Sequence, residues 1–141
     1  MLKTSAIALA LVLGLASAAS AANPILKNPP ANFKKVSTLV KLPELVPGLG
    51  VLYVDPATLP VGPFLSYDKK GKLINITYMP TIKLFEAHKD WKTLGSFGGG
   101  ITLDHTDILY NAGHPGVAEP HYHIVQWLIP HNQESKRLGE K

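Results

Sequence analysis

The residues of this chain that could do chemistry gather near its C-terminal end, where five of the six histidines lie between His105 and His131. Two of them, His121 and His123, are two residues apart in the stretch EPHYHIV, which otherwise has the composition of a β-strand. Side chains two apart on a strand point to the same face, roughly 6.6 Å apart along it. Two imidazoles in this arrangement can bind one divalent ion, and imidazole suits zinc, copper, nickel and iron.

Further candidate ligands surround this histidine pair. The preceding predicted strand presents histidine and aspartate on one face, and the loop between the strands adds a histidine and, at its end, Glu119. An inventory of three or four nitrogen and oxygen ligands is typical of an open metal site. The predicted metal ligands are His105, Asp107, His114, His121 and His123, with zinc, copper or iron as the candidate ions.

The register of the two strands decides whether these ligands meet. A shift of one residue turns every side chain to the opposite face, and the long loop NAGHPGVAEP does not fix the register. Two other interpretations therefore stay open beside the metal site. The histidines could form a hydrogen-bonded structural network, or the region could hold an organic ligand in a pocket lined by Tyr110, Tyr122 and Trp127.

The sequence does not decide whether the protein is an enzyme. None of its serines lies in the strand–turn–helix context of a hydrolase nucleophile, and the chain contains no cysteine. An acid–base pair such as His105 with Asp107 would need a substrate pocket beside it. Catalytic residues therefore remain unassigned.

The first 22 residues have the layout of an export signal. Lys3 precedes an apolar run from Ala6 to Leu15, and Ala19-Ser20-Ala21 matches the small-residue pattern that signal peptidase recognises. The apolar run is shorter than the roughly 20 residues of a permanent membrane helix. We expect residues 1–22 to be removed and the mature protein to be periplasmic or secreted, with no stable insertion in the membrane.

Composition limits the partners and the source of stability. The formal net charge is +4, and the lysines are scattered along the chain with a single arginine. Nucleic-acid binding normally requires a concentrated basic face, so we expect no nucleic-acid partner. Because there is no cysteine, disulfides and sulfur-ligated zinc are excluded, and stability must come from burial, oligomerisation or a metal ion.

The remaining residues predict one β-rich domain. A proline-rich N-terminal arm covers residues 23–46, the domain residues 47–133, and a charged tail residues 134–141. The prolines of the arm exclude it from a central strand. The predicted fold class is α+β and mostly β, a small antiparallel sheet or barrel-like domain with about one helix.

The expected elements follow from periodicity and turn signals. A short strand is expected near residues 50–56, and two strands flank the turn at 68–72, where Gly71 can adopt a positive φ. Alternating polarity from 72 to 79 predicts a strand buried on one face. Helical spacing predicts one helix over 81–91. Two final strands are expected over 101–110 and 121–130.

The stretches GKLINITYMP, FEAHKDW and DHTDILYNAGHPGVAEPHYHI resemble an uncharacterised family of exported bacterial domains of unknown function. Its pattern is a DH-x-D strand, a GH-x-G loop and a PH-[YF]-D-x-H strand, and the resemblance covers residues 47–130. His123 stands where the pattern has aspartate, and Val125 where it has its second histidine, so any ligand set is altered here. The resemblance implies an exported, β-rich and oligomeric domain, and no reaction. The matching positions are Asp104, His105, Asp107, His114, Pro120 and His121.

Two functional hypotheses follow. The first is an exported, non-catalytic binding or structural protein that forms a homo-oligomer through the arm from Asn23 to Lys35. The second is a metal-binding protein, or a metal-dependent enzyme, that uses the histidine and aspartate cluster of the C-terminal strand pair.

Overall fold

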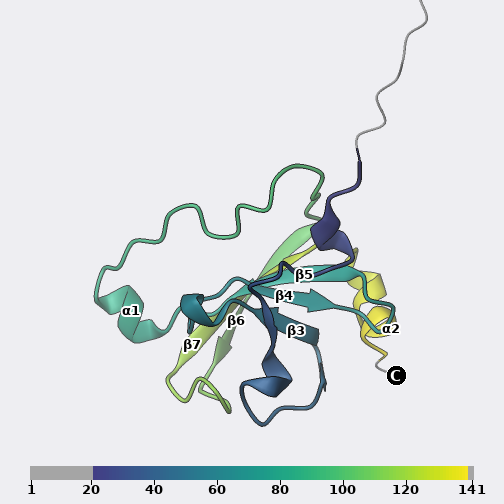
Figure 1. Ribbon diagram of the computed structural model, residues 1–141. Coiled ribbons are helices and arrows are strands. Elements are labelled where there is room, and N and C mark those ends of the chain that lie inside the picture. The colour runs from purple at the N-terminus through teal and green to yellow at the C-terminus, as the bar shows by residue number, and fades with distance from the viewer. Residues whose placement is uncertain (1–20, 140–141) are drawn as a thin grey trace, which may run out of the picture.

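The computed structural model describes residues 21–139, which form one open antiparallel sheet with two short α-helices (Figure 1). The strands are β1 (Lys34–Lys35), β2 (Leu45–Val46), β3 (Gly50–Val54), β4 (Phe64–Tyr67), β5 (Leu73–Tyr78), β6 (His105–Asn111) and β7 (His121–Trp127). The helices are α1 (Ile82–Glu86) and α2 (Glu134–Leu138), with 3-10 turns η1 (Pro24–Leu26), η2 (Val36–Thr38), η3 (Pro56–Thr58) and η4 (His131–Gln133). The predicted mostly β class with an antiparallel sheet is confirmed.

The strand order across the sheet is β1-β3-β4-β5-β7-β6, and β2 also pairs with β3. Because β6 lies at one end of this order and β1 at the other, the sheet does not close into a barrel. Directly opposed residues of an antiparallel pair lie on the same face. The register aligns Val54, Phe64, Thr77, Val125 and Asp107 in one row across the sheet. We call the face that carries this row the histidine face, because His121 and His123 share it with Val125 along β7.

The hairpin between β4 and β5 forms around the predicted turn. Gly71 has a φ of +70°, and the Asp68 carboxylate accepts hydrogen bonds of 2.9 Å from the backbone N–H groups of Lys70 and Lys72. The expectation that β5 is buried on one face only is wrong. Asn75 is as buried as its apolar neighbours, because both faces of the sheet are covered by other segments.

The N-terminal arm supplies much of this cover. Ile25 is buried on the face opposite the histidine face, where its carbonyl accepts a 2.7 Å hydrogen bond from the Tyr67 hydroxyl. Val36 is buried on the histidine face against Val54 and its neighbours. The arm also contributes β1 and β2, both at the outer side of β3. Its prolines stay outside these strands, as the missing amide donor requires.

Helix α1 is shorter than the predicted helix at 81–91. Thr81 caps its N-terminus by accepting a hydrogen bond from the Leu84 amide, and the helix ends before His88, which has a φ of +51°. Its apolar side faces little of the sheet, since Phe85 remains exposed and packs edge-on against Trp91. The chain then arches away from the sheet as a long loop before it returns to β6 (Figure 1).

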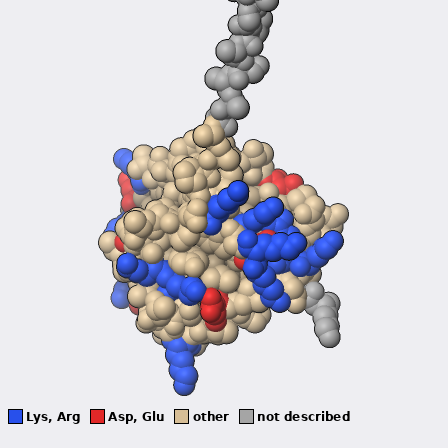
Figure 2. Space-filling model, turned by 45° about the vertical axis from the view of Figure 1, so that its right-hand side comes forward, with Lys and Arg blue, Asp and Glu red and all other residues tan. Residues whose placement is uncertain are grey.

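The charged tail forms helix α2 and packs against the domain. Leu138 is buried beside Val125 and Trp127, and the Arg137 guanidinium donates a 2.6 Å hydrogen bond to the buried Asp68 carboxylate. This contact brings α2 next to the lysine-rich turn at 68–72. Lys and Arg side chains accordingly gather near the C-terminal end in Figure 2, although the sequence suggests that they are scattered.

The sequence predicts a cleaved export signal and a mature protein without stable insertion in the membrane. The export signal predicted at residues 1–22 lies outside the described residues, apart from its last two. Within residues 21–139, no helix is long and apolar enough to cross a bilayer.

Candidate metal centre

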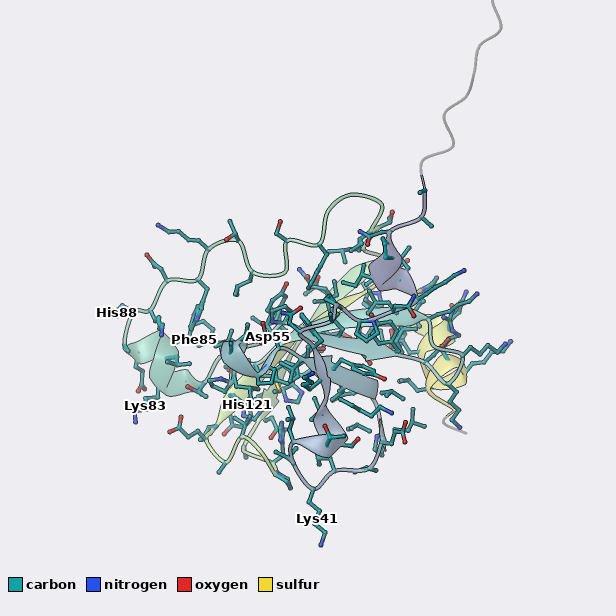
Figure 3. The ribbon with its side chains drawn as sticks, in the orientation of Figure 1. Lys41, Asp55, Lys83, Phe85, His88 and His121 are labelled. Atoms are coloured by element: carbon teal, nitrogen blue, oxygen red, sulfur yellow. The ribbon has the colours of Figure 1, made fainter. Side chains whose placement is uncertain are left out.

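Three histidine side chains converge at one end of the histidine face. The Nε2 atoms of His114, His121 and His123 lie 2.9 Å (His121 to His123), 3.2 Å (His114 to His121) and 3.3 Å (His114 to His123) from one another. We call these three residues the histidine triad. In Figure 3, His121 lies within the body of the domain, whereas His88 and Phe85 project with α1 away from it. The triad therefore belongs to the sheet and its loops, and not to the protruding helix.

Pairing on both sides of β7 fixes the position of His121. This residue is opposed to Asn111 of β6 on one side and forms a bridge with Thr81 on the other. The Pro120 carbonyl also accepts a hydrogen bond of 3.0 Å from the amide of Ile82. As a result the side chain is completely buried, at 0% exposure. His123 follows two residues later on the same face, opposite Leu109.

A tight turn in the β6–β7 loop positions the third histidine, His114. His114 and Val117 exchange two backbone hydrogen bonds of 2.9 and 3.0 Å, and Val117 is buried in the apolar cluster of the histidine face. Gly113 precedes this turn with a φ of +132°, and a Cβ atom there would collide with the backbone carbonyl of Ala118. The loop therefore has little freedom to move His114 away from β7.

Backbone contacts fix the tautomer of two triad members. The Nδ1 atom of His121 lies 2.7 Å from the carbonyl oxygen of Glu119, and that of His114 lies 3.0 Å from the carbonyl oxygen of Pro115. A carbonyl oxygen can only accept, so both Nδ1 atoms carry a proton, which in a neutral ring is the only one. The Nε2 atoms of both rings are then bare acceptors that face each other across 3.2 Å.

A neutral hydrogen-bond network cannot satisfy this arrangement. His123 can place one N–H between the other two rings, but no proton is left for the contact between His114 and His121. Two facing lone pairs in a buried site repel each other and lack the solvation they would have in water. A cation at the centre would remove the conflict. Histidine ligands bound to metals commonly donate their second N–H to a backbone carbonyl, as both of these rings do.

The environment of His123 favours its neutral imidazole. Burial, and after it charge repulsion from the neighbouring rings of His121 and His114, lowers the pKa of His123 from its usual 6.5 to about 4. Metal ligation requires deprotonated nitrogen. At neutral pH the His123 side chain is therefore already in the form that binds a metal ion.

The spacing of the three nitrogens suits a tetrahedral ion. Nitrogens bound to zinc at about 2.05 Å with tetrahedral angles lie about 3.3 Å apart, close to the separations in the triad. Three protein ligands leave one position of a tetrahedral ion open. Glu119 does not fill that position, because its carboxylate lies near Lys83 at 4.0 Å and only its carbonyl contacts the triad.

An apolar cavity of about 430 Å³ adjoins the triad on the histidine face. His114 and His123 line it, whereas His121 is buried behind them. The open side of the triad therefore faces the cavity. No pattern in the sequence signals this cavity, because its outer wall comes from residues 36–49, far from the histidines along the chain.

The structure does not bring His105 and Asp107 to the triad. Both lie on the histidine face, but the register places His105 opposite Trp127, four residues from His123 along β7. Four residues of strand span about 13 Å. Asp107 instead accepts a 2.9 Å hydrogen bond from the Trp127 indole N–H.

His105 belongs to a second polar group near α2. Its Nδ1 atom lies 2.8 Å from the Asp104 carboxylate, and its Nε2 atom lies 3.0 Å from Glu134, at ion-pair distance but without hydrogen-bond geometry. The hydrogen bond that the His105 ring donates to the Asp104 carboxylate raises the pKa of His105 above its usual value, and the charges of Asp107 and Glu134 act in the same direction. His105, His131 and Glu134 are close enough to hold an ion. The raised pKa of His105 favours its imidazolium form, however. We therefore interpret this group as a charge network that connects α2 to β6.

The organic-ligand pocket predicted from Tyr110, Tyr122 and Trp127 is wrong. Tyr110 and Tyr122 are opposed on one face, whereas Trp127 lies on the histidine face. Tyr110 is also 59% exposed. The cavity described above is lined by other residues.

Fold and site together define a small open-sheet domain with a histidine triad beside an apolar cavity. A comparison with solved structures finds the hypothetical protein TTHB210 from Thermus thermophilus, which is 41% identical with a TM-score of 0.61. The match covers 71% of this chain and 90% of that chain, so this chain belongs to the same family as TTHB210. No family model and no curated protein matches the chain. The resemblance to the family of exported domains stays a prediction.

Proposed function

We propose that this protein binds one divalent transition-metal ion through the Nε2 atoms of His114, His121 and His123. One observation carries the proposal. Two of these nitrogens are held as bare acceptors 3.2 Å apart by their Nδ1 contacts to backbone carbonyls. A bound cation accounts for this arrangement, and a neutral hydrogen-bond network does not.

The ligand set favours a transition-metal ion, and zinc, copper and iron are the three predicted from the sequence. Three imidazoles suit each of these ions, whereas calcium and magnesium prefer oxygen ligands. An open coordination position distinguishes catalytic zinc sites from closed structural ones. The proposed ion would therefore take a water molecule or a small ligand on the side of the cavity.

Metal analysis tests this proposal. Protein purified without an affinity tag, then stripped and dialysed against zinc, copper(II) or iron(II), should retain one ion per chain by elemental analysis. The double variant His121→Ala, His123→Ala should lose it. His88→Ala and His131→Ala, both at exposed positions, form the matched control and should retain it. Equal metal content in the two double variants would contradict the assignment.

A second observation supports self-association, as a companion to metal binding. Strand β6 is an edge strand of the sheet, and three consecutive apolar residues on it are exposed: Ile108 (66%), Leu109 (52%) and Tyr110 (59%). An exposed apolar edge strand is a ready template for another chain. We propose homo-oligomerisation through β6 in place of the arm, because the arm packs on its own domain.

Light scattering after size-exclusion chromatography tests this second proposal. Ile108→Lys should lower the molar mass of the native protein, and Leu94→Lys, on an exposed loop position, should not. A wild-type mass equal to one chain would rule out the proposal. Export remains a further proposal based on residues 1–22, and N-terminal sequencing of protein from an extracytoplasmic fraction would test it.

A further inference from the structure

The cavity beside the triad has the composition of a site for an aliphatic ligand. Its inner wall is formed by sheet residues such as Leu52, Val54 and Phe64, and its outer wall by Val36, Val40 and their neighbours in residues 36–49. Its volume of about 430 Å³ falls within the range of about 300–1,000 Å³ typical of small-molecule sites. Among its described lining residues, Phe64 supplies the only benzene ring. Branched aliphatic side chains thus form most of the surface.

The polar groups of the cavity are confined to one end. Asn111, His114 and His123 line it there, and the Asn111 side-chain oxygen is already bound to the amide of Gly113 at 2.8 Å. The triad and the NH2 group of Asn111 are thus the parts of the wall that can recognise a polar head group. Toward solvent, the rim carries exposed Leu39 and Leu59. Exposed apolar side chains around an apolar hollow are typical of a ligand-binding site.

We propose that this cavity binds a linear aliphatic acid, with its hydrocarbon chain along the apolar walls and its carboxylate at the triad. The position of the head group rests on the proposed function, because the carboxylate would fill the open coordination position of the bound ion. The placement of the chain does not rest on it. Apolar cavities take up apolar molecules, so the hydrocarbon would bind to the metal-free protein as well.

Decanoate and 1-decanol serve as the probes, measured by isothermal titration calorimetry on zinc-loaded and metal-free protein. We expect both to bind the metal-free protein, and zinc to tighten decanoate by about tenfold while leaving decanol unchanged. Zinc binding is measured separately by equilibrium dialysis. If the protein binds decanol and decanoate but does not bind zinc, the proposed function is refuted and the hydrocarbon site is not.

Cavity variants identify where the probes bind. Val40→Trp fills the cavity from its outer wall, and Leu39→Glu places a charge at the exposed rim in case the first variant fails to fold. Each should weaken decanol binding by about tenfold or more. Leu103→Trp, at an exposed position outside the cavity, should not.

Three results would overturn the proposal. One is binding of both probes weaker than about 1 mM. Another is unchanged binding in both Val40→Trp and Leu39→Glu. The third is a zinc-loaded protein that binds decanoate no more tightly than the metal-free one. In the first case, dissociation of an oligomer by Val40→Trp would assign the cavity to a second copy of the chain instead.

Discussion

The depressed pKa of His123 predicts how the metal-free protein responds to acid. Burial and the adjacent rings of His121 and His114 lower this pKa from 6.5 to about 4 in the folded protein. Between these two values the unfolded chain binds more protons than the folded one, so the free energy of unfolding rises with pH. This contribution is complete above about pH 6.5 and is lost as the pH falls toward 4.

The magnitude follows from the size of the shift. One pKa unit corresponds to about 1.4 kcal/mol, so the full shift is equivalent to about 3 kcal/mol. Solvent in the adjoining cavity and relaxation of the triad reduce the effect, and we expect about 2 kcal/mol. The variant His123→Gln keeps a polar side chain of similar length and cannot titrate in this range. Its stability should therefore fall less between pH 7 and pH 4.

Urea unfolding at a series of pH values measures this difference. Chelator-treated wild type and His123→Gln are compared at each pH, so that contributions from carboxylates and from histidines outside the triad cancel. Wild type should lose about 2 kcal/mol more than the variant between pH 7 and pH 4. Parallel curves, within the roughly 0.5 kcal/mol error of extrapolation, would refute the environment assigned to His123.

Three further predictions concern the loop, the second polar group and the tail. Gly113→Ala should weaken zinc binding, measured by equilibrium dialysis, by about tenfold or more. The reason is that a Cβ atom at this position would collide with the backbone of Ala118, and that φ is +132°. The control Gly99→Ala, where a Cβ atom would have no neighbour within 4 Å, should leave zinc binding unchanged. Asp104→Asn should lower the pKa of His105, measured by NMR titration, because that carboxylate is the main cause of its increase. Arg137→Met should lower the free energy of unfolding by about 2 kcal/mol, since it removes a charge-assisted bond to a buried carboxylate.

Each of these has a clear contrary result. Equal zinc affinity in the two glycine variants would mean that the β6–β7 loop does not position His114. An unchanged His105 titration in Asp104→Asn would remove the basis for the charge network. Arg137→Met as stable as the wild type would show that α2 is held by apolar contacts such as those of Leu138.

Local signals in the sequence were sufficient for the hairpin and for part of the triad. The turn around Gly71 predicts the two flanking strands β4 and β5, and the H-x-H spacing puts His121 and His123 on one face. These features depend on residues close together in the chain, whose geometry the strand period and turn chemistry determine. The same period could not give the register between β6 and β7.

Register and long-range packing account for what sequence reasoning missed. His105 and Asp107 have the right residue types and the right face, but four residues of register place His105 beyond reach of the triad, and Asp107 is bound to Trp127 instead. The cavity depends on residues 36–49 folding back over the sheet, and the full burial of β5 depends on the arm and the tail. No local pattern encodes these contacts, because they form between segments distant in sequence.

X-ray absorption spectroscopy of the zinc-loaded protein examines the coordination of the ion itself. We expect four light-atom neighbours at about 2.0–2.1 Å, with multiple-scattering features of three imidazoles. Gln in place of His114 should remove one imidazole and retain the other two. A spectrum dominated by carboxylate or water oxygens, unaltered by that substitution, would show that the ion binds elsewhere.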